Sequence, residues 1–273
     1  MSFKILSWNV EAFKGSSERL PRVVDHIKTD EPDVIGLFEV ENMDIIDLVD
    51  NYFPGYNFHL TQGSQNKEIL VGYRKDKFET VIFTQKREFK VYNPFLRPGA
   101  LLTVKYLGKL YNILFLHTDS GTEAADFGNR QEMFDKIWRL KKTLNRVGKS
   151  ENAPFIVLGD LNTMGLNFPT RRKSDQRVSA IDEIVTLDSV GSKTGMTVLP
   201  KNEPETFNNL RLQSNLDHVV ASTSIAFAEI GKDVANNPQF VSVRGWNQLS
   251  GNERKDFIDH ISDHSSLTVT VLE

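Results

Sequence analysis

Residues 155–162 read Phe-Ile-Val-Leu-Gly-Asp-Leu-Asn, four apolar residues followed at once by a glycine and two polar side chains. A short continuous apolar run is typical of a strand that is covered on both faces. Asp160 and Asn162 stand two positions apart, so on an extended chain their side chains point to the same side. The stretch therefore predicts an inner strand that ends in a carboxylate and an amide, although Gly-Asp-x-Asn also suits a turn.

Similar apolar runs recur along the whole chain, and helical patterns separate some of them. The other strand-like runs occupy residues 3–8, 34–38, 69–73, 101–106, 111–116, 216–221 and 267–272. Apolar residues at helical spacing mark residues 19–28, 43–50, 129–146 and 177–187. Strands outnumber helices and helices interrupt them irregularly, which favours an α+β domain with mixed sheets. No Pro/Gly/Ser-rich linker divides the chain, so we expect a single domain over residues 1–273, with a long loop at about 231–262.

Polar residues stand at or beside the ends of six of these strand-like segments. They are Asn9, Glu39, His117, Asp160, Asn162, Asp217, Asp263 and His264. Burying such groups is costly unless they are paired. Gathered at one edge of a sheet, they would form an acidic, histidine-containing site suited to a hard metal ion and to phosphate chemistry.

The most informative of these residues are Asp217 and His264. A buried Asp that accepts a hydrogen bond from one imidazole nitrogen fixes the tautomer and stabilises the charged ring. The individual signals have simpler explanations as well: Glu39 also fits a surface glutamate at a loop start, and His117 also fits a satisfied core histidine. The hypothesis of a common site rests on all of them together.

The bulk properties restrict the class of protein. The chain has 273 residues, no cysteine and a net charge of −3. The absence of cysteine excludes disulfides, thiol catalysis and Cys-ligated zinc, and the mild acidity argues against a protein dedicated to wrapping long duplex nucleic acid. No run of 18 apolar residues predicts a membrane span, and no leader precedes the first strand-like run, so we expect a cytoplasmic location.

A basic cluster follows the Asp160–Asn162 strand end, in a stretch that has the composition of a loop. Its members are Arg171, Arg172, Lys173 and Arg177. Loops after strand ends often carry binding groups, so contact with a phosphate and exposure to solvent are equally good explanations of this cluster.

The order of these motifs resembles the endonuclease/exonuclease/phosphatase superfamily, whose members have the deoxyribonuclease-I-like fold. The resemblance spans almost the whole chain and rests on Trp8-Asn9, Phe38-Glu39-Val40, Gly159-Asp160-Leu161-Asn162, Thr206-Phe207 with Leu216-Asp217, and Ser262-Asp263-His264. It implies an α+β fold in the form of a four-layer α/β/β/α sandwich, with two mixed β-sheets packed face to face and helices outside.

The resemblance also implies roles for the individual residues. Mg²⁺, with Mn²⁺ or Ca²⁺ as possible substitutes, would be held by Glu39, Asn9 and Asp263. Asp160 or His264 would orient or deprotonate the attacking water, and Asp217 would hold His264. The expected phosphate contacts are Asn9, Arg97, His117 and Asn162, and Glu68 is expected to support His117 as a paired carboxylate.

The implied activity is Mg²⁺-dependent hydrolysis of phosphate esters, by a phosphodiesterase or nuclease that acts on nucleic acid. The alternative is the same chemistry on a small phosphorylated molecule, such as a nucleotide derivative, a sphingolipid head group or an inositol phosphate. The mild acidity favours this alternative, as does Glu41, which stands where many nucleases of the family have Lys or Arg. A catalytically silent binding module is the third hypothesis, and the presence of every Asp and His position argues against it. The sequence indicates no protein partner.

Overall fold

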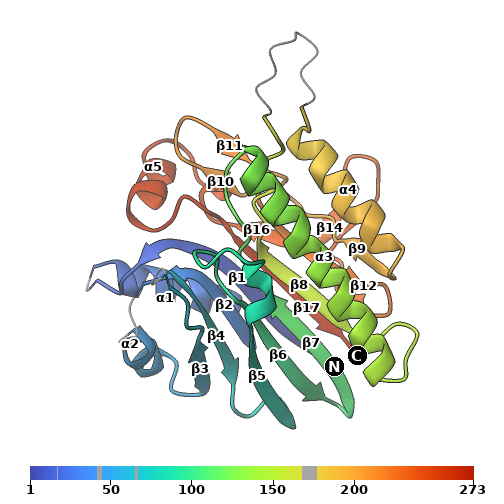
Figure 1. Cartoon of the computed structure of the whole chain (residues 1–273). Coiled ribbons are helices and arrows are strands. Elements are labelled where there is room, and N and C mark those ends of the chain that lie inside the picture. The colour runs from blue at the N-terminus through green and yellow to red at the C-terminus, as the bar shows by residue number, and fades with distance from the viewer. Residues whose placement is uncertain (17, 42–44, 65–66, 168–176) are drawn as a thin grey trace.

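Two mixed β-sheets lie face to face, with helices on both outer faces (Figure 1). This computed structural model describes residues 1–16, 18–41, 45–64, 67–167 and 177–273. The first sheet has seven strands in the order β13-β17-β1-β2-β4-β3, with β16 paired to β17, and the second has six in the order β5-β6-β7-β8-β12-β9. The arrangement confirms the predicted α+β fold with four layers.

The strands of the first sheet are β1 (Ser2–Phe13), β2 (Val34–Val40), β3 (Tyr56–Leu60), β4 (Glu68–Arg74), β13 (Ala226–Phe227), β16 (Ser242–Arg244) and β17 (Ser266–Leu272). Those of the second sheet are β5 (Thr80–Lys86), β6 (Gly99–Tyr106), β7 (Lys109–Phe115), β8 (Phe155–Asp160), β9 (Met196–Val198) and β12 (Asp217–Ser222). Two short ribbons pair β10 (Phe207–Asn208) with β11 (Gln213–Ser214), and β14 (Gly231–Lys232) with β15 (Pro238–Gln239). The helices are α1 (Arg19–Asp30), α2 (Ile45–Tyr52), α3 (Ala124–Val147), α4 (Ala180–Ser192) and α5 (Gly251–His260), with 3-10 turns η1 (Arg87–Lys90) and η2 (Trp246–Gln248).

Three layers of apolar side chains hold the sheets and helices together. Phe38 and Phe115 belong to the layer between the sheets, where Gly36 is needed because a Cβ there would lie 2.1 Å from the Phe115 ring. Outside the first sheet, residues such as Val24 of α1 pack with residues of α2 and α5. Outside the second sheet, residues such as Met133 of α3 pack with Leu187 of α4. Because both faces of the inner strands are covered, their sequences are almost continuously apolar.

Parallel pairs in the middle of each sheet align the strand ends that carry polar residues. β1 runs parallel to β2, and β7 runs parallel to β8. β12 is antiparallel to β8, with Asp217 directly opposite Asp160. β17 is antiparallel to β1, so the start of β17, just after His264, lies beside the part of β1 that leads to Asn9. Polar residues from six separate segments therefore meet at one edge of the two sheets.

All eight apolar runs form strands, and the four predicted helices exist with shifted ends. Helix α4 begins at Ala180 rather than at 177, because the Ser179 hydroxyl accepts a hydrogen bond from the Asp182 backbone N–H at 3.0 Å and caps it. Residues 43 and 44, the predicted start of the second helix, lie outside the described residues. The sequence does not predict β3 and β5, edge strands with mostly half-buried or exposed side chains.

The predicted long loop at about 231–262 is wrong. The segment contains β14, β15, β16, η2 and the ten-residue helix α5. Of the residues in α5, Phe257 and Ile258 are the buried ones, so its apolar stripe is too short to show clear helical periodicity. Among the helices in the described part of the chain, none is long and apolar enough to cross a membrane.

Candidate active site

Asp160, at the end of β8, lies at the centre of the group of polar side chains. Its Oδ2 accepts a hydrogen bond from Asn9 Nδ2 at 3.0 Å. The same oxygen lies 3.4 Å from His117 Nε2 and 3.8 Å from His264 Nε2. Three side chains from different segments of the chain therefore converge on one carboxylate oxygen.

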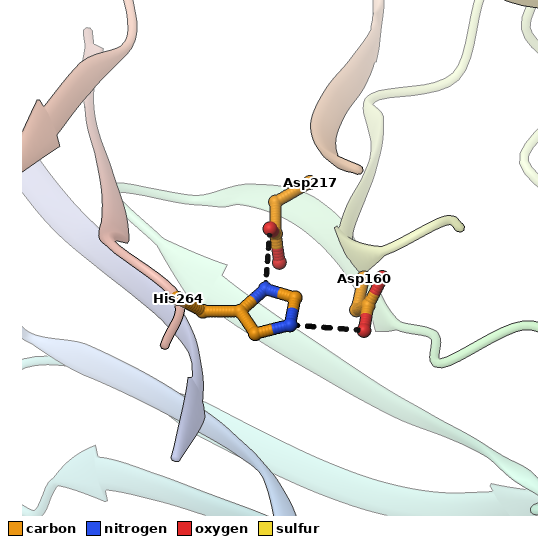
Figure 2. A group of neighbouring side chains, drawn as sticks. All are labelled: Asp160, Asp217 and His264. Carbon is orange, nitrogen blue, oxygen red and sulfur yellow. Dashed lines mark hydrogen bonds and ion pairs between the residues drawn. The ribbon is translucent and has the colours of Figure 1, made fainter. Parts of the chain in front are cut away.

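Asp217 and His264 form the predicted pair (Figure 2). His264 Nδ1 lies 2.8 Å from Asp217 Oδ2, and the opposite nitrogen of the ring faces Asp160. The main chain of His264 is fixed as well, because its carbonyl accepts from Trp8 Nε1 at 2.8 Å and its N–H donates to Ser262 Oγ at 3.0 Å. The ring thus stands between two carboxylates with its orientation set from both sides.

This arrangement shifts the pKa values of both His264 and Asp160. Burial by itself lowers the pKa of His264, but the charges of Asp217 and Asp160 outweigh it and raise that pKa to about 10. Burial, together with the charge of Asp217, raises the pKa of Asp160 to about 7. The imidazole of His264 is therefore a cation at neutral pH, and Asp160 is more basic than an ordinary aspartate, as suits a general base.

Glu39 lies next to this group, on a strained part of β2. It has φ 60°, in the left-handed region that non-glycine residues rarely adopt, and the pairing of β2 with β4 is irregular there. Its Oε2 accepts from the Ala12 backbone N–H at 3.3 Å and from Lys67 Nζ at 2.7 Å, and its Oε1 lies 3.5 Å from Asn9 Nδ2. Burial opposes ionisation, but the hydrogen bond and charge of Lys67 outweigh it and lower the pKa of Glu39.

His117 follows β7 and is only 3% exposed. Its Nε2 faces Asp160, and among the described residues its Nδ1 has no hydrogen-bond partner. Burial and the nearby charge of Arg97 hold the pKa of His117 well below its usual value, so the ring is neutral at physiological pH. A neutral, buried imidazole with one unused nitrogen differs from a fully satisfied core histidine.

The Gly-Asp-Leu-Asn stretch forms both a turn and part of the site. The Asn162 backbone N–H donates to Asp160 Oδ1 at 3.2 Å, which is the turn chemistry that the sequence also allows, and the Asn162 amide donates to the Thr118 carbonyl at 3.2 Å. Gly159 has φ 147°, and a Cβ there would lie 2.1 Å from the Leu116 carbonyl oxygen. Only glycine permits this close approach, which brings Asp160 against the segment that carries His117.

Asp263 lies near the same ring nitrogen of His264 that faces Asp160. Its Oδ1 is 4.0 Å from His264 Nε2 and, among the described residues, has no hydrogen-bond partner. Burial raises the pKa of Asp263 to about 6. A buried carboxylate oxygen without a donor is an available ligand for a cation.

Arg97 and Glu68, two further predicted residues, make no direct contact with Asp160 among the described interactions. Arg97 Nε donates to the Lys67 carbonyl at 2.9 Å, which places the guanidinium beside the Glu39 side of the site. Glu68 does not pair with His117: its carboxylate accepts from Thr61 Oγ1 at 2.5 Å and from the Gly63 N–H at 2.6 Å.

The direction of the Glu68 side chain explains this correction. Side chains alternate along a strand, and Glu68 has the same parity in β4 as Leu70, which belongs to the outer core of the first sheet. Ile69 and Val71 instead face the second sheet, which carries His117. Lys67 is a further residue of the site that the sequence does not predict, because its only signal is its position just before a strand. Arg171, Arg172 and Lys173 of the predicted basic cluster lie outside the described residues.

The donor groups fit a hard divalent cation. In the described part of the chain, Asp160, Asp217 and His264 have ligand atoms within 4.8 Å of one another, but Asp217 and His264 are already bonded to each other. Glu39 and Asp263 offer carboxylate oxygens that are better placed, since one carries a lysine cation and the other has no partner. Oxygen ligands of this kind suit Mg²⁺ or Ca²⁺.

Asn9 is the weakest of the predicted ligands in this arrangement. Its side-chain oxygen Oδ1 accepts from the Glu11 N–H at 3.0 Å, so its side-chain nitrogen Nδ2 faces the carboxylates. A direct role in holding the cation would require rotation of the Asn9 amide.

The fold and the site define a phosphoric ester hydrolase with a deoxyribonuclease-I-like sandwich. Residues 6–264 match the Endonuclease/Exonuclease/phosphatase family, and the chain belongs to this family. A comparison with curated proteins by sequence gave no match.

Several solved structures have a similar fold. TDP2 of D. rerio complexed with a single-strand DNA product is 14% identical, with a TM-score of 0.65, and the match covers 100% of this chain and 99% of that chain. The 3′ phosphatase NExo from Neisseria bound to a product DNA hairpin is 16% identical, with a TM-score of 0.63 and 98% of both chains covered. A family member from Bacteroides thetaiotaomicron is 17% identical, with a TM-score of 0.61 and coverage of 99% and 97%. At these low sequence identities, the likeness to the three structures shows a shared fold alone.

Proposed function

We propose that this protein hydrolyses phosphate ester bonds in nucleic acid with Mg²⁺, as a phosphodiesterase or nuclease, through one catalytic domain over residues 1–273. The observation that carries the proposal is the convergence of Asn9, His117 and His264 on the Asp160 carboxylate, with Glu39 beside it. The two DNA-bound structures of similar fold support nucleic acid as the substrate class.

The proposed metal ligands are the Glu39 and Asp263 carboxylates. A divalent cation bound there supplies polarisation of a phosphoryl oxygen. The Lys67 cation on Glu39 and the unpartnered oxygen of Asp263 support this assignment. Mn²⁺ and Ca²⁺ are the substitutes to test, because they accept the same oxygen ligands.

Asp160 is the proposed acceptor of the proton from the attacking water. Its Oδ1 is held by the Asn162 N–H and its Oδ2 by the Asn9 amide, so the carboxylate has a fixed orientation. His264 is less suited to accept a proton, since Asp217 keeps it charged. The imidazolium instead stabilises the negative charge that develops on the phosphoryl oxygens.

The proposed phosphate contacts are the remaining neutral and cationic groups around Asp160. His117 is neutral and points its Nε2 into the site, and Arg97 lies at the Glu39 side. Asn9 adds a side-chain amide that donates to Asp160, and Asn162 adds a side-chain amide that donates to the Thr118 carbonyl. Several positioned donors are needed together, because enzymes lower the barrier of such reactions by on the order of 20 kcal/mol.

The second candidate is the same reaction on a small phosphorylated molecule. Glu41 favours it, because Glu41 stands where many nucleases of the family have Lys or Arg. Lys14 Nζ lies 3.1 Å from Glu41 Oε2, so the charge of this lysine is paired within the protein and adds little attraction for a nucleic acid backbone.

Hydrolysis of bis-(p-nitrophenyl) phosphate by the purified protein tests the common chemistry. We expect activity that stops with EDTA and returns with added Mg²⁺. The Asp160→Asn variant should lose at least about a hundredfold in kcat, the scale of a lost general base, and it excludes a contaminating nuclease. Activity that survives EDTA, or that survives in this variant, contradicts the proposal.

Nicking of supercoiled plasmid at physiological salt, compared with release of inorganic phosphate from small monoesters, decides between the two substrate classes. Cleavage of the plasmid at a rate far above that of the monoesters supports the nuclease. The opposite order supports the alternative.

A further inference from the structure

We propose that Lys67 holds the Glu39 carboxylate in the metal-free protein, gives way when a divalent cation binds Glu39, and then binds the substrate phosphate. The inference rests on the proposed function, because it takes the metal and the phosphate from it. It adds to that function a lysine that competes with the metal ion for Glu39 and then contacts the substrate phosphate.

The first observation is the direct ion pair. Lys67 Nζ lies 2.7 Å from Glu39 Oε2, with 36% of the lysine side chain and 17% of the glutamate side chain exposed. Glu39 is the one residue with which Lys67 forms an ion pair within the described part of the chain. The ammonium group therefore occupies one of the two carboxylate oxygens that Glu39 could offer to a metal.

The second observation is that the main chain of Lys67 is fixed while its side chain can move. Arg97 Nε donates to the Lys67 carbonyl at 2.9 Å, and Lys67 directly precedes β4, which is paired on both sides. A lysine side chain has four rotatable carbon–carbon bonds and a third of this one is exposed, so the ammonium can leave Glu39 without any change in the strand.

The two cations compete for the same oxygen. A divalent cation bound at Glu39 would weaken the ion pair with Lys67, because two cations held by one carboxylate repel each other. The other contacts of Glu39 come from groups without a full positive charge: the Ala12 N–H, the Asn9 amide and the neutral His117 ring at 3.9 Å. Lys67 is therefore the contact of Glu39 that metal binding opposes most.

The displaced ammonium remains at the phosphate side of the site. Lys67 Nζ is bonded to Glu39 Oε2, His117 Nε2 lies 3.9 Å from Glu39 Oε1, and Arg97 Nε donates to the Lys67 carbonyl. A phosphate held by His117 therefore lies within the range of the Lys67 charge. A lysine that leaves a carboxylate for a phosphate keeps a charge-assisted hydrogen bond in both states.

Mg²⁺ titration by isothermal calorimetry without substrate tests the first half of the proposal. Lys67→Met should bind Mg²⁺ about fivefold more tightly than the wild type, since it removes a competing ion pair at a partly exposed site. Lys67→Arg should stay close to the wild type. Lys14→Met is the matched control, because Lys14 pairs with Glu41 nearby and not with Glu39, and it should leave the Mg²⁺ affinity unchanged.

Steady-state kinetics at saturating Mg²⁺ tests the second half. Lys67→Met should raise KM by about tenfold through the lost charged contact, and Lys67→Arg should restore most of it. Tighter metal binding together with weaker substrate binding is an outcome that a purely structural ion pair does not produce.

Unchanged or weaker Mg²⁺ binding in Lys67→Met overturns the inference, and so does Mg²⁺ binding that persists in Glu39→Gln. Because the titration needs no turnover, its result stands even if no phosphate ester is hydrolysed. Absence of hydrolysis together with the expected titration would refute the proposed function and leave the competition at Glu39 supported.

Discussion

The pair of Asp217 and His264 gives the sharpest prediction about catalysis. Asp217→Asn keeps the size of the side chain and allows an amide oxygen to accept from His264 Nδ1, but it removes the negative charge. At the 2.8 Å separation, Coulomb's law with an effective dielectric constant of about 20 gives roughly 6 kcal/mol for this charge pair. The remaining neutral hydrogen bond and the nearby Asp160 offset part of that loss.

We expect about half of this energy to be lost from the transition state, roughly 3 kcal/mol, which lowers kcat by about a hundredfold. The loss should depend on pH. In the wild type the neighbouring carboxylates raise the pKa of His264 to about 10, so the ring stays charged throughout the neutral range. In Asp217→Asn the pKa falls toward the ordinary value, so the deficit should grow from pH 6 to pH 9.

The assay is kcat for bis-(p-nitrophenyl) phosphate between pH 6 and pH 9 at saturating Mg²⁺. Thermal unfolding followed by circular dichroism shows whether the variant is folded. Asp76→Asn, at a fully exposed aspartate, is the matched control and should retain wild-type activity at every pH. More than a tenth of wild-type kcat at pH 8, or a deficit that is equal at pH 6 and pH 9, would refute the charge-stabilising role of Asp217.

Two further predictions concern stability. Burial, assisted by the charge of Arg244, lowers the pKa of His26 to about 3. Between about pH 3 and pH 6.5 the unfolded chain therefore binds a proton that the folded chain does not, so each unit of acidification removes about 1.4 kcal/mol from the free energy of unfolding. The free energy of unfolding, measured by urea denaturation at pH 7, 6 and 5, should fall less steeply with acidification in His26→Gln than in the wild type. An equal fall in both proteins would contradict the prediction. The second concerns Arg130 and Glu183, whose side chains are fully buried and bonded at 3.0 Å. Arg130→Met should lower the free energy of unfolding by about 3 to 5 kcal/mol, because Glu183 keeps its hydrogen bonds from Gln131 and Gly165 but loses the cation that balances its buried charge. Arg130→Met/Glu183→Gln should recover part of that loss in the same assay, and a single-variant loss below about 1 kcal/mol would contradict this account.

The sequence predicts the inner strands well because both of their faces are buried, so nearly every residue in them must be apolar. β8 and β7 are examples, with every residue of Phe155–Asp160 buried. Edge strands such as β5 alternate between half-buried and exposed positions, so their apolar signal is weak. Helix α5 is missed for a similar reason, since most of its ten residues face solvent.

The candidate site follows the same division. The sequence predicts Asp160, Asp217 and His264 because each stands beside a strand that the apolar pattern identifies. It cannot predict the partner of Glu68, because that depends on which face of β4 the side chain occupies. Lys67 has no pattern of its own, and its contact with Glu39 depends on the pairing of β4 with β2.

The chain by itself determines where buried strands occur and which polar groups follow them, because burial of backbone and apolar side chains imposes a local pattern on the sequence. The tertiary structure decides which of these groups meet. Asp217 reaches His264 across 47 residues, and Asn9 reaches Asp160 across 151. Residues so far apart in the sequence are brought together by the register of the strands and by the packing of one sheet on the other. Both depend on the whole chain at once.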